Sequence, residues 1–522
     1  MKKTFGIMSS LLVKIGIVVA LLLVVGFFSL RIDFSKNKAY SLSRVSKETM
    51  RALEDVMVVK IVSSSSLPAS MNALDRYTND LLREYASVSR GKFRYEYIKP
   101  RTQEELYQLA QASGLSRIRF QIFEKDQMTT KEVIFGLIFE YQGRVQSLNL
   151  MPQMEPKLEY ELTMRIQALA AHTMPKVAVF RDSTYLDFNV EAFERSLSSN
   201  FDTYDAKLIE PLVHTDALLF TGTARDISEN QLYNLDQYIM GGGKVVFLQD
   251  KVDTDGRHLF PLDTNVIKLL EHYGFRLSDD VVLDMHCDLR QVGLGNMMHY
   301  PMYPVLRGSS HPITQNMDNI VMYLASGVSF SGKAGISFEP ILQSSAQSGW
   351  MKAPEFQLKK ELFYDPSYED FTAGPINTAA ILSGSFDSYF IGSSFAETDS
   401  DFVAKSPKLK MVLFGDKELV IESDQSIYDQ RSNVILNALD YLLDRASMIH
   451  IRSRHLGSSL LSVPRFMQRI GITWGNMEKI ENNIKTTAKV IAIVLPPLIL
   501  IIIGLLAALK RKLKLRYYHE KN

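Results

Sequence analysis

Short apolar runs alternate with amphipathic stretches in the first third of the chain. Residues 56–62 form a β-branched run of the kind that predicts a buried strand. After Pro68, apolar residues recur at the spacing of one helical face. The whole pattern predicts strands at 56–62, 92–98, 117–124 and 132–141 and helices at 68–90, 102–114 and 157–172. This β-α-β-α-β-β-α order is that of a thioredoxin-like layer, so we expect an α/β domain over residues 46–172.

A second series of alternating elements begins after Pro175. The pattern predicts strands at 176–180, 216–222, 244–250, 280–284, 378–384, 388–394 and 410–416 and helices at 189–199, 228–240, 263–275 and 432–445. Strands that alternate with helices are typical of a parallel sheet covered on both faces. Between about 286 and 374 the pattern loosens, and frequent Gly, Ser, Pro and Met predict long loops. We therefore expect a larger α/β domain at 175–446 with a loop-rich insertion at about 286–374.

Two strongly apolar stretches predict membrane spans. Residues 490–509 carry no charge, and at about 1.5 Å per residue such a helix is roughly 30 Å long, the thickness of a bilayer core. Pro496 and Pro497 are tolerated in a membrane helix when neighbouring groups satisfy the freed carbonyls. Residues 15–30 are also apolar, and residues 5–13 extend them. A cleaved signal peptide is the alternative there, but no A-x-A site follows, which favours an uncleaved anchor within residues 1–32.

Basic residues flank both predicted spans and set the expected orientation. Lys2, Lys3 and Lys14 accompany the first span, and five Lys or Arg residues lie at 510–516, at the start of the tail at 510–522. Short basic flanks stay in the cytoplasm. We therefore expect both termini on the cytoplasmic side of a bacterial inner membrane and the bulk of the chain in the periplasm. Residues 447–489 would be a membrane-proximal connector that lies along the bilayer, against a partner, or simply as an ordered link.

Composition excludes several classes of protein. The 522 residues have a formal net charge of +1, so no broad basic field is available to hold nucleic acid. Cys287 is the single cysteine, which rules out an internal disulfide. The sequence contains no C-x-x-C motif and no Cys/His array with zinc spacing. Redox chemistry and a structural zinc site are therefore not expected.

The three glycines at 241–243, followed by Lys244, raise the possibility of a phosphate-binding loop. A P-loop needs G-x-x-x-x-G-K-[ST] after a strand and before a helix. Here a predicted helix precedes the glycines, a predicted strand follows them, and Val245 stands where a hydroxyl would bind magnesium. Glycine commonly ends a helix, because it adopts the left-handed conformation without a Cβ penalty. We expect helix termination and no nucleotide.

Residues 284–288 gather polar side chains at the end of a predicted strand. The cluster contains residue types that can bind a metal or act as a nucleophile: Asp284, His286, Cys287 and Asp288. The ends of strands in α/β sheets often carry functional sites. Adjacent residues on an extended chain point in opposite directions, however, so His286 is poorly placed to activate Cys287. A polar loop is the simpler interpretation. We predict no catalytic residue, no cofactor-binding residue and no metal ligand.

Several local phrases resemble those of one family. They are residues 37–53, Leu67–Pro68 with 81–85, residues 158–169, residues 236–250, and Ile451–Arg454 ahead of the C-terminal span. They resemble GldG, the auxiliary subunit of a gliding-motility-associated ABC transporter, and the resemblance covers nearly the whole chain except about 286–374. The resemblance implies an extracytoplasmic region similar to a class I glutamine-amidotransferase-like sheet without the nucleophile. It also implies an ABC-2-type permease and a separate cytoplasmic ATPase as partners, and no catalytic residue is carried over.

Two other functions remain open from the sequence. The cluster at Asp284–Asp288 allows a membrane-anchored envelope hydrolase, and the two spans also fit an envelope scaffold with no role in transport. The favoured hypothesis is a non-enzymatic transporter subunit that docks on a permease through its two membrane helices and binds cargo or an envelope partner.

Overall fold

The computed structural model of the 522-residue chain describes residues 41–456 with short gaps. The gaps are 99, 101, 125–126, 153, 171–173, 183–189, 256, 293–295, 318–319, 358–362, 364–370 and 422–430. Both predicted membrane spans, the basic tail and most of the predicted connector lie outside the described residues. Within residues 41–456 as described, no helix has the length and apolar character needed to cross a membrane.

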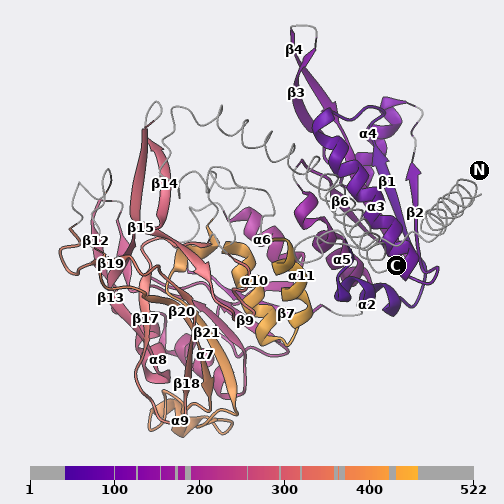
Figure 1. Ribbon diagram of the computed structural model, residues 1–522. Helices are drawn as coiled ribbons and strands as arrows, with labels where there is room; N and C mark the ends of the chain where they lie inside the picture. The colour runs from indigo at the N-terminus through magenta and orange to yellow at the C-terminus, as the bar shows by residue number, and fades with distance from the viewer. Residues whose placement is uncertain are drawn as a thin grey trace, which may run out of the picture. The chain divides into compact units, whose positions relative to one another are not determined.

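The first part of the chain folds around a four-stranded sheet with the order β2-β1-β5-β6 (Figure 1). Its elements are α2 (Arg44–Ala52), β1 (Met57–Ser63), η2 (Ala69–Met71), α3 (Asn72–Val88), β2 (Phe93–Ile98), α4 (Gln103–Ala112), β3 (Ile118–Glu124), β4 (Gln127–Val133), β5 (Phe135–Tyr141), β6 (Arg144–Asn149) and α5 (Glu155–Ala170). Strand β1 pairs in parallel with β2 and antiparallel with β5, which continues into β6. The chain order of the predicted elements is therefore confirmed.

Two strands in this part escaped the sequence pattern. The expected strand at 132–141 is divided at Ile134 between β4 and β5, which belong to different sheets. Strand β4 pairs only with β3 in a separate hairpin, and its polar sequence QMTTKEV carries no apolar alternation. Strand β6 lies at the edge of the sheet with Val145 exposed, so it also lacks the pattern of a buried strand.

The second part is built on a ten-stranded sheet in which β14-β15-β18-β20-β21-β10-β9-β7-β8 lie side by side and β16 pairs with β15. Its first elements are β7 (Lys176–Phe180), α6 (Glu191–Ser198), β8 (Asp202–Asp205), β9 (Ala217–Phe220), α7 (Glu229–Met240), β10 (Val245–Leu248), β11 (Val252–Thr254), β12 (Leu259–Pro261) and α8 (Asn265–Tyr273). Its last elements are β20 (Asn377–Gly384), α9 (Ser394–Thr398), β21 (Leu409–Phe414), η6 (Lys417–Val420), α10 (Arg431–Leu442) and α11 (Ala446–Leu456). The mixed α/β class is confirmed.

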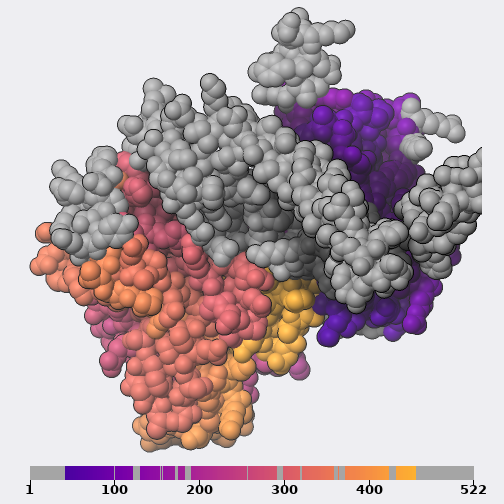
Figure 2. Space-filling model, viewed as in Figure 1, coloured from indigo at the N-terminus to yellow at the C-terminus, as the bar shows by residue number. Residues whose placement is uncertain are grey.

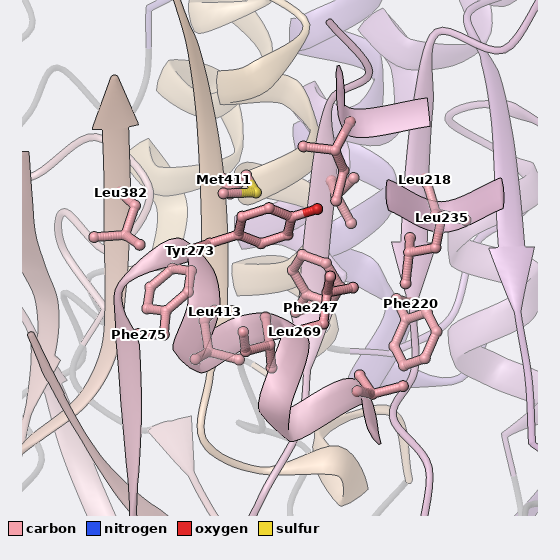
Figure 3. Close-up of a cluster of buried hydrophobic side chains, with 14 of the residues drawn as sticks. Leu218, Phe220, Leu235, Phe247, Leu269, Tyr273, Phe275, Leu382, Met411 and Leu413 are labelled. Carbon is pink, nitrogen blue, oxygen red and sulfur yellow. The ribbon is translucent and has the colours of Figure 1, made fainter. Parts of the chain in front are cut away.

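Strands β8, β7, β9, β10 and β21 run parallel to one another, and both of their faces are covered. Val245 and Phe247 of β10 point to one face, where α7 and α8 supply the facing side chains (Figure 3). Val246 and Leu248 point to the other face, which packs against α6 and α10. Burial on both faces explains why these strands are continuous apolar runs without alternation.

Among the described residues between Cys287 and Met351, much of the region that the sequence pattern predicted as loops is strand. The elements here are β13 (Phe275–Asp284), which leads into the region, and then β14 (Cys287–Val292), β15 (Asn296–Gly308), β16 (Ile320–Val321), β17 (Ser326–Phe330), β18 (Ser337–Gln343) and β19 (Ser348–Met351). Part of this region, in pink to orange, lies on the face of the molecule that Figure 2 shows. The alternation is hidden because β14 and β18 carry register shifts and β15 contains Pro301 and Pro304.

The strand predicted at 388–394 is a turn that leads into α9. Its aromatic residues resemble a strand, but two groups of the turn donate to Asp236 of α7. The Ser388 hydroxyl donates to Oδ2 at 2.6 Å, and the Tyr389 amide donates to Oδ1 at 2.9 Å. Phe390 is buried in the core that α7 shares with the sheet. A tertiary anchor on Asp236 therefore overrides the local strand preference.

Candidate functional site

The strand order of the larger sheet marks one edge as the expected position of a site. Numbered along the chain, the five parallel strands lie in the order second, first, third, fourth and fifth. The connection therefore reverses direction between β7 and β9. Ligands of open α/β sheets bind beyond the carboxyl ends of the strands near such a reversal. The residues that follow β7, β9, β10 and β21 are thus the first place to look for a function.

Polar side chains at this edge bond mainly to one another. Asp182 follows β7, and its Oδ2 accepts a hydrogen bond from the Thr223 hydroxyl at 3.2 Å. Gln249 follows β10, and its side chain accepts from the amide of Thr223 and donates to the carbonyl of Thr223, both at 3.0 Å. Thr221 donates its hydroxyl to the carbonyl of Phe180 at 2.8 Å. These contacts hold the ends of neighbouring strands together.

A buried ion pair lies one strand further along the same edge. Lys417 of η6 places its Nζ 3.2 Å from Asp250 Oδ2 and 3.0 Å from Asp253 Oδ1. The side chain of Lys417 is 8% exposed and that of Asp250 is 2% exposed. Asp250 comes two residues after the end of β10, and Lys417 comes shortly after its parallel neighbour β21. Topology alone brings these residues together, because 167 positions separate them along the chain.

Burial controls the ionisation of this pair. Burial raises the pKa of Asp250 to about 6, and the neighbouring Lys417 opposes part of that rise. Burial alone would lower the pKa of Lys417, but the carboxylates of Asp250 and Asp253 outweigh it and raise that pKa above its ordinary value. Lys417 is therefore held as a cation at neutral pH, and it cannot serve as a neutral amine base.

Two more carboxyl groups, at the N-cap and in the first turn of η6, complete the cluster. Asp416 caps η6 by accepting from the Glu418 amide at 2.7 Å, and its other oxygen accepts from the Tyr323 amide at the same distance. Burial raises the pKa of Asp416 well above its ordinary value, and the nearby Glu418 raises it further. Burial also raises the pKa of Glu418 to about 7, although Lys417 opposes this. The edge thus carries more carboxyl groups than it can hold ionised at low cost.

Replacing Glu418 with glutamine is expected to make the stability of the protein less dependent on pH. A carboxyl group whose pKa rises on folding stabilises the folded state below its unfolded pKa, here about 4.5, and that stabilisation is lost as the pH rises through about 7. Glutamine mimics the protonated group. The variant should match wild type at pH 4.5 and exceed its free energy of unfolding by about 3 kcal/mol above pH 7.

Urea denaturation at several pH values would measure this difference. The charged groups that act on Glu418 are Lys417, Asp250, Asp253 and Arg431. Glu191→Gln on the exposed surface of α6 is the matched control, and it should leave the pH dependence unchanged. A Glu418→Gln difference that stays constant from pH 4.5 to pH 8 would contradict the expectation.

An arginine surrounded by tyrosines lies next to the carboxyl cluster. The guanidinium of Arg290 lies 5.0, 5.6 and 5.8 Å from the ring centroids of Tyr303, Tyr323 and Tyr300. It also donates to Asp288 Oδ2 at 3.1 Å and to the Tyr323 hydroxyl at 3.3 Å. The guanidinium of a second arginine, Arg431, also lies over the Tyr323 ring, 4.7 Å from its centroid. The sequence pattern assigned tyrosines to cores, whereas these rings are half-buried and cover a cation.

The arrangement as a whole is suited to holding structure. The residues that directly follow β7, β9, β10 and β21 are Arg181, Thr221, Gln249 and Gly415, and none of them is a serine or cysteine. Within the part of the chain that the structure describes, no group of three or more His, Cys, Asp or Glu residues could hold a metal ion. Each charge of the central pair faces an opposite charge at about 3 Å. The chemistry available here is internal charge compensation.

The structure gives Asp284–Asp288 structural roles. Asp284 is buried and closes two turns, because it accepts from the His286 amide at 2.8 Å and from both the amide and the hydroxyl of Ser345 at 2.6 Å. His286 bonds through its ring to the Val305 carbonyl. Burial raises the pKa of the Cys287 thiol to about 12, which disfavours the thiolate that a nucleophile requires. His299, on β15, is the ring near its sulfur at 3.8 Å.

The glycines at 241–243 end α7, as the sequence predicted. The amides of Gly241, Gly242 and Gly243 donate to carbonyls of the last helical turn at 2.8–2.9 Å. Gly242 has φ +93°, the left-handed conformation. At the start of the same helix, Ser228 and Gln231 form a capping box. Lys244 leads into β10, so these residues are a helix end followed by a strand.

Replacing Gly242 with alanine is expected to lower the free energy of unfolding by about 1–2 kcal/mol, because a Cβ is disfavoured in the left-handed conformation. The added Cβ would also lie 3.1 Å from Pro407 Cγ. Gly241→Ala is the control, since its added Cβ would meet a contact of similar length, 3.3 Å to the Gln237 carbonyl, at φ −72°, which alanine readily adopts. Thermal unfolding of both variants would test this, and equal midpoints would contradict it.

Comparison with known proteins places the chain in a family. A family model described as an ABC-type uncharacterized transport system matches residues 168–444, which is more than half of the chain. The chain belongs to this family. The matched region of this ABC-transport auxiliary chain contains the larger sheet and the buried pair of Asp250 and Lys417. A second model, described as a domain of unknown function, matches residues 36–140.

The ABC-transport auxiliary chain is similar to other proteins over much of its length. An uncharacterized protein of Borreliella burgdorferi is 20% identical over 503 residues, which cover 92% of this chain and 93% of that protein. A solved structure described as mmIFT52 N-terminal domain covers 51% of this chain and 97% of its own, with a TM-score of 0.32 and 13% identity.

Sequence reasoning missed the charged cluster of this auxiliary chain, although a signal was present. The predicted strands at 244–250 and 410–416 both end in aspartate, Asp250 and Asp416. In a parallel sheet such residues lie at one edge. The strand order needed to make β10 and β21 neighbours was not evident, so the two aspartates could not be linked to Lys417.

Proposed function

We propose that this chain is a non-catalytic auxiliary subunit of an ABC-2-type transporter and that its folded body binds cargo or an envelope partner. Membership in an ABC-type transport family supports the general role. The observation that carries the non-catalytic part is the buried pair of Lys417 and Asp250. At the edge where α/β enzymes place their reactive groups, this chain has a cation compensated by its own carboxylates.

The proposal includes a membrane topology. Residues 15–30 and 490–509 would anchor the chain in the inner membrane, with both termini in the cytoplasm and the body in the periplasm. The charge-free run and the basic flanks support this arrangement. ATP hydrolysis would then belong to a separate cytoplasmic ATPase, and the two anchors would dock on the permease.

We further infer that the chain is a GldG-type subunit and that its process is gliding motility or a related envelope function. The quoted phrases at 37–53, 158–169 and 236–250 support the inference. The order β2-β1-β5-β6, with β1 and β2 parallel, is consistent with a thioredoxin-like domain. The parallel strands of the larger sheet are consistent with a class I glutamine-amidotransferase-like sheet that lacks its nucleophile.

Copurification tests the proposed role. The tagged full chain, extracted in mild detergent, is expected to bring down a permease and an ATPase encoded by the same cell. A matched preparation of an unrelated inner-membrane protein with two spans controls for carry-over. Recovery of the chain without either component would count heavily against a transporter subunit and would favour an envelope scaffold.

Protease accessibility tests the topology separately. Protease added to intact spheroplasts is expected to cleave the body of the chain, because the proposal places residues 33–487 outside the cytoplasm. A cytoplasmic marker protein should survive the same treatment. Full protection of the body, with cleavage only after the membrane is permeabilised, would overturn the proposed location.

A further inference from the structure

Helix α5 joins two helices that come from opposite ends of the described chain. One apolar cluster contains Val45 of α2, Tyr160 and Met164 of α5, and Met448 and Ile451 of α11. Helix α2 begins at residue 44, and α11 ends at residue 456. Three helices that are distant in sequence therefore share one small core within the described residues.

On one side of α5, a buried acid holds the start of α2. Glu159 Oε1 accepts from the Ser43 amide at 2.6 Å and from the Ser46 hydroxyl at 2.7 Å. Ser46 also bonds to Thr163 at 2.9 Å, and Thr163 bonds to the Tyr85 hydroxyl at 2.5 Å. A carboxylate at a helix N-terminus is favoured by the helix dipole and by the unpaired amides there. The first turn of α2 is thus fixed to α5 by hydrogen bonds as well as by packing.

On another side of α5, a buried tyrosine accepts hydrogen bonds from α11. Arg452 of α11 donates from Nε and Nη2 to the Tyr160 hydroxyl at 3.1 and 3.0 Å. The Tyr160 hydroxyl in turn donates to Asn200 Oδ1 at 2.7 Å. Arg452 also donates to Asn437 at 2.5 Å and to Asp440 at 2.8 Å, both on α10. Arg452 therefore ties α5 to α10, which is part of the core of the larger sheet.

Two adjacent residues of α5 bond to the two helices that lie at opposite ends of the described chain. Glu159 holds α2 and Tyr160 holds α11, so a displacement of either partner acts on the same turn of α5. Buried polar groups fix relative positions more strictly than apolar packing does, because each displaced group would lose its hydrogen bond without gaining water. Leu158 and Leu162 of α5 lie in the core of the smaller sheet. The junction thus has the properties of a rigid connection between α2, α11 and both sheets.

We propose that α5 is a coupling element, through which the segments next to the two membrane spans act on one another and on both sheets. This inference rests on the proposed membrane topology, in which α2 follows the first span and α11 precedes the segment that leads to the second. A movement of the permease that shifts either span would then displace α2 or α11 and, through their contacts, α5. The junction itself can be tested in the isolated chain.

Hydrogen exchange of the full chain in detergent micelles, read for the amides of α2, α5 and α11, tests the coupling. Ser46→Ala removes one hydroxyl on the α2 side. It is expected to raise the exchange rates in α11 as well as in α2 by about fivefold, the effect of losing one buried hydrogen bond. Tyr160→Phe removes the hydroxyl on the α11 side and should raise exchange in α2 by a similar factor, because energetic coupling is reciprocal.

Arg119→Met is the matched control, because Arg119 bonds to Glu132 in the β3–β4 hairpin of the same part of the chain. It should leave exchange in all three helices unchanged. Increases confined to α2 for Ser46→Ala and to α11 for Tyr160→Phe would overturn the coupling. Ser46→Ala and Tyr160→Phe each remove a single oxygen, so both variants should fold. The measurement needs only this chain, so its result is separate from a failure to recover a permease.

Discussion

Replacing Lys417 with methionine is expected to lower the free energy of unfolding by about 3–5 kcal/mol at pH 7. The substitution keeps most of the buried volume but leaves Asp250 without the cation that lies 3.2 Å away. Removing one partner of a buried pair is costly, since the remaining charge loses its partner without regaining water. At pH 5 the loss should be smaller, because the pKa of Asp250 is already about 6 and rises further without the cation.

Urea denaturation followed by circular dichroism would measure the loss. Lys268→Met is the control, since Lys268 pairs with Asp263 on the exposed surface of α8 and should change stability by less than about 0.5 kcal/mol. Adding Asp250→Asn to Lys417→Met should recover part of the loss by removing the orphaned charge. A Lys417→Met variant as stable as the control would show that the pair of Lys417 and Asp250 does not stabilise the folded state.

Replacing Arg452 with methionine is expected to cost about 3 kcal/mol and to separate α5 from α10. The side chain of Arg452 is 2% exposed, and its guanidinium bonds to Tyr160, Asn200, Asn437 and Asp440. Asp440 is fully buried but keeps a second cation, because Arg445 lies 3.4 Å from its other oxygen. That remaining contact places the expected loss at the lower end of the range for broken buried pairs.

Limited proteolysis together with urea denaturation would check this expectation. Arg195→Met on α6 is the control, since its pairing with Glu191 at 3.4 Å is solvent-exposed and contributes little. The Arg452→Met variant should be cleaved faster between α5 and β7 than the control. Equal cleavage rates and equal urea midpoints would contradict the role assigned to Arg452.

Individual helices and strands were predictable where the local order of apolar residues and glycines follows directly from burial or from backbone conformation. Strand β10 is a continuous apolar run because α7 and α8 cover one face and α6 and α10 the other. The end of α7 was predictable because glycine at Gly242 is required by the left-handed backbone. The strands between Cys287 and Met351 were misread as loops because bulges and prolines interrupt the alternation on which strand prediction depends.

The candidate site was much less predictable than the elements that carry it. Lys417 and Asp250 lie 167 residues apart, and Arg452 and Tyr160 lie 292 residues apart. No local pattern encodes which strand lies beside which, since that choice depends on how whole layers pack. The tyrosines around Arg290 show the same limit, because their spacing does not reveal that they surround one guanidinium.

The sequence by itself determined the alternation of strands and helices, the helix end at Gly242, the absence of a P-loop and the two apolar runs that we expect to span a membrane. These features depend on residues close together in the chain, where backbone conformation and burial act locally. Only the tertiary structure decided that Lys417 compensates Asp250 and that α5 connects α2 to α11. Those contacts follow from the order of strands and the packing of helices, which arise from the whole chain at once.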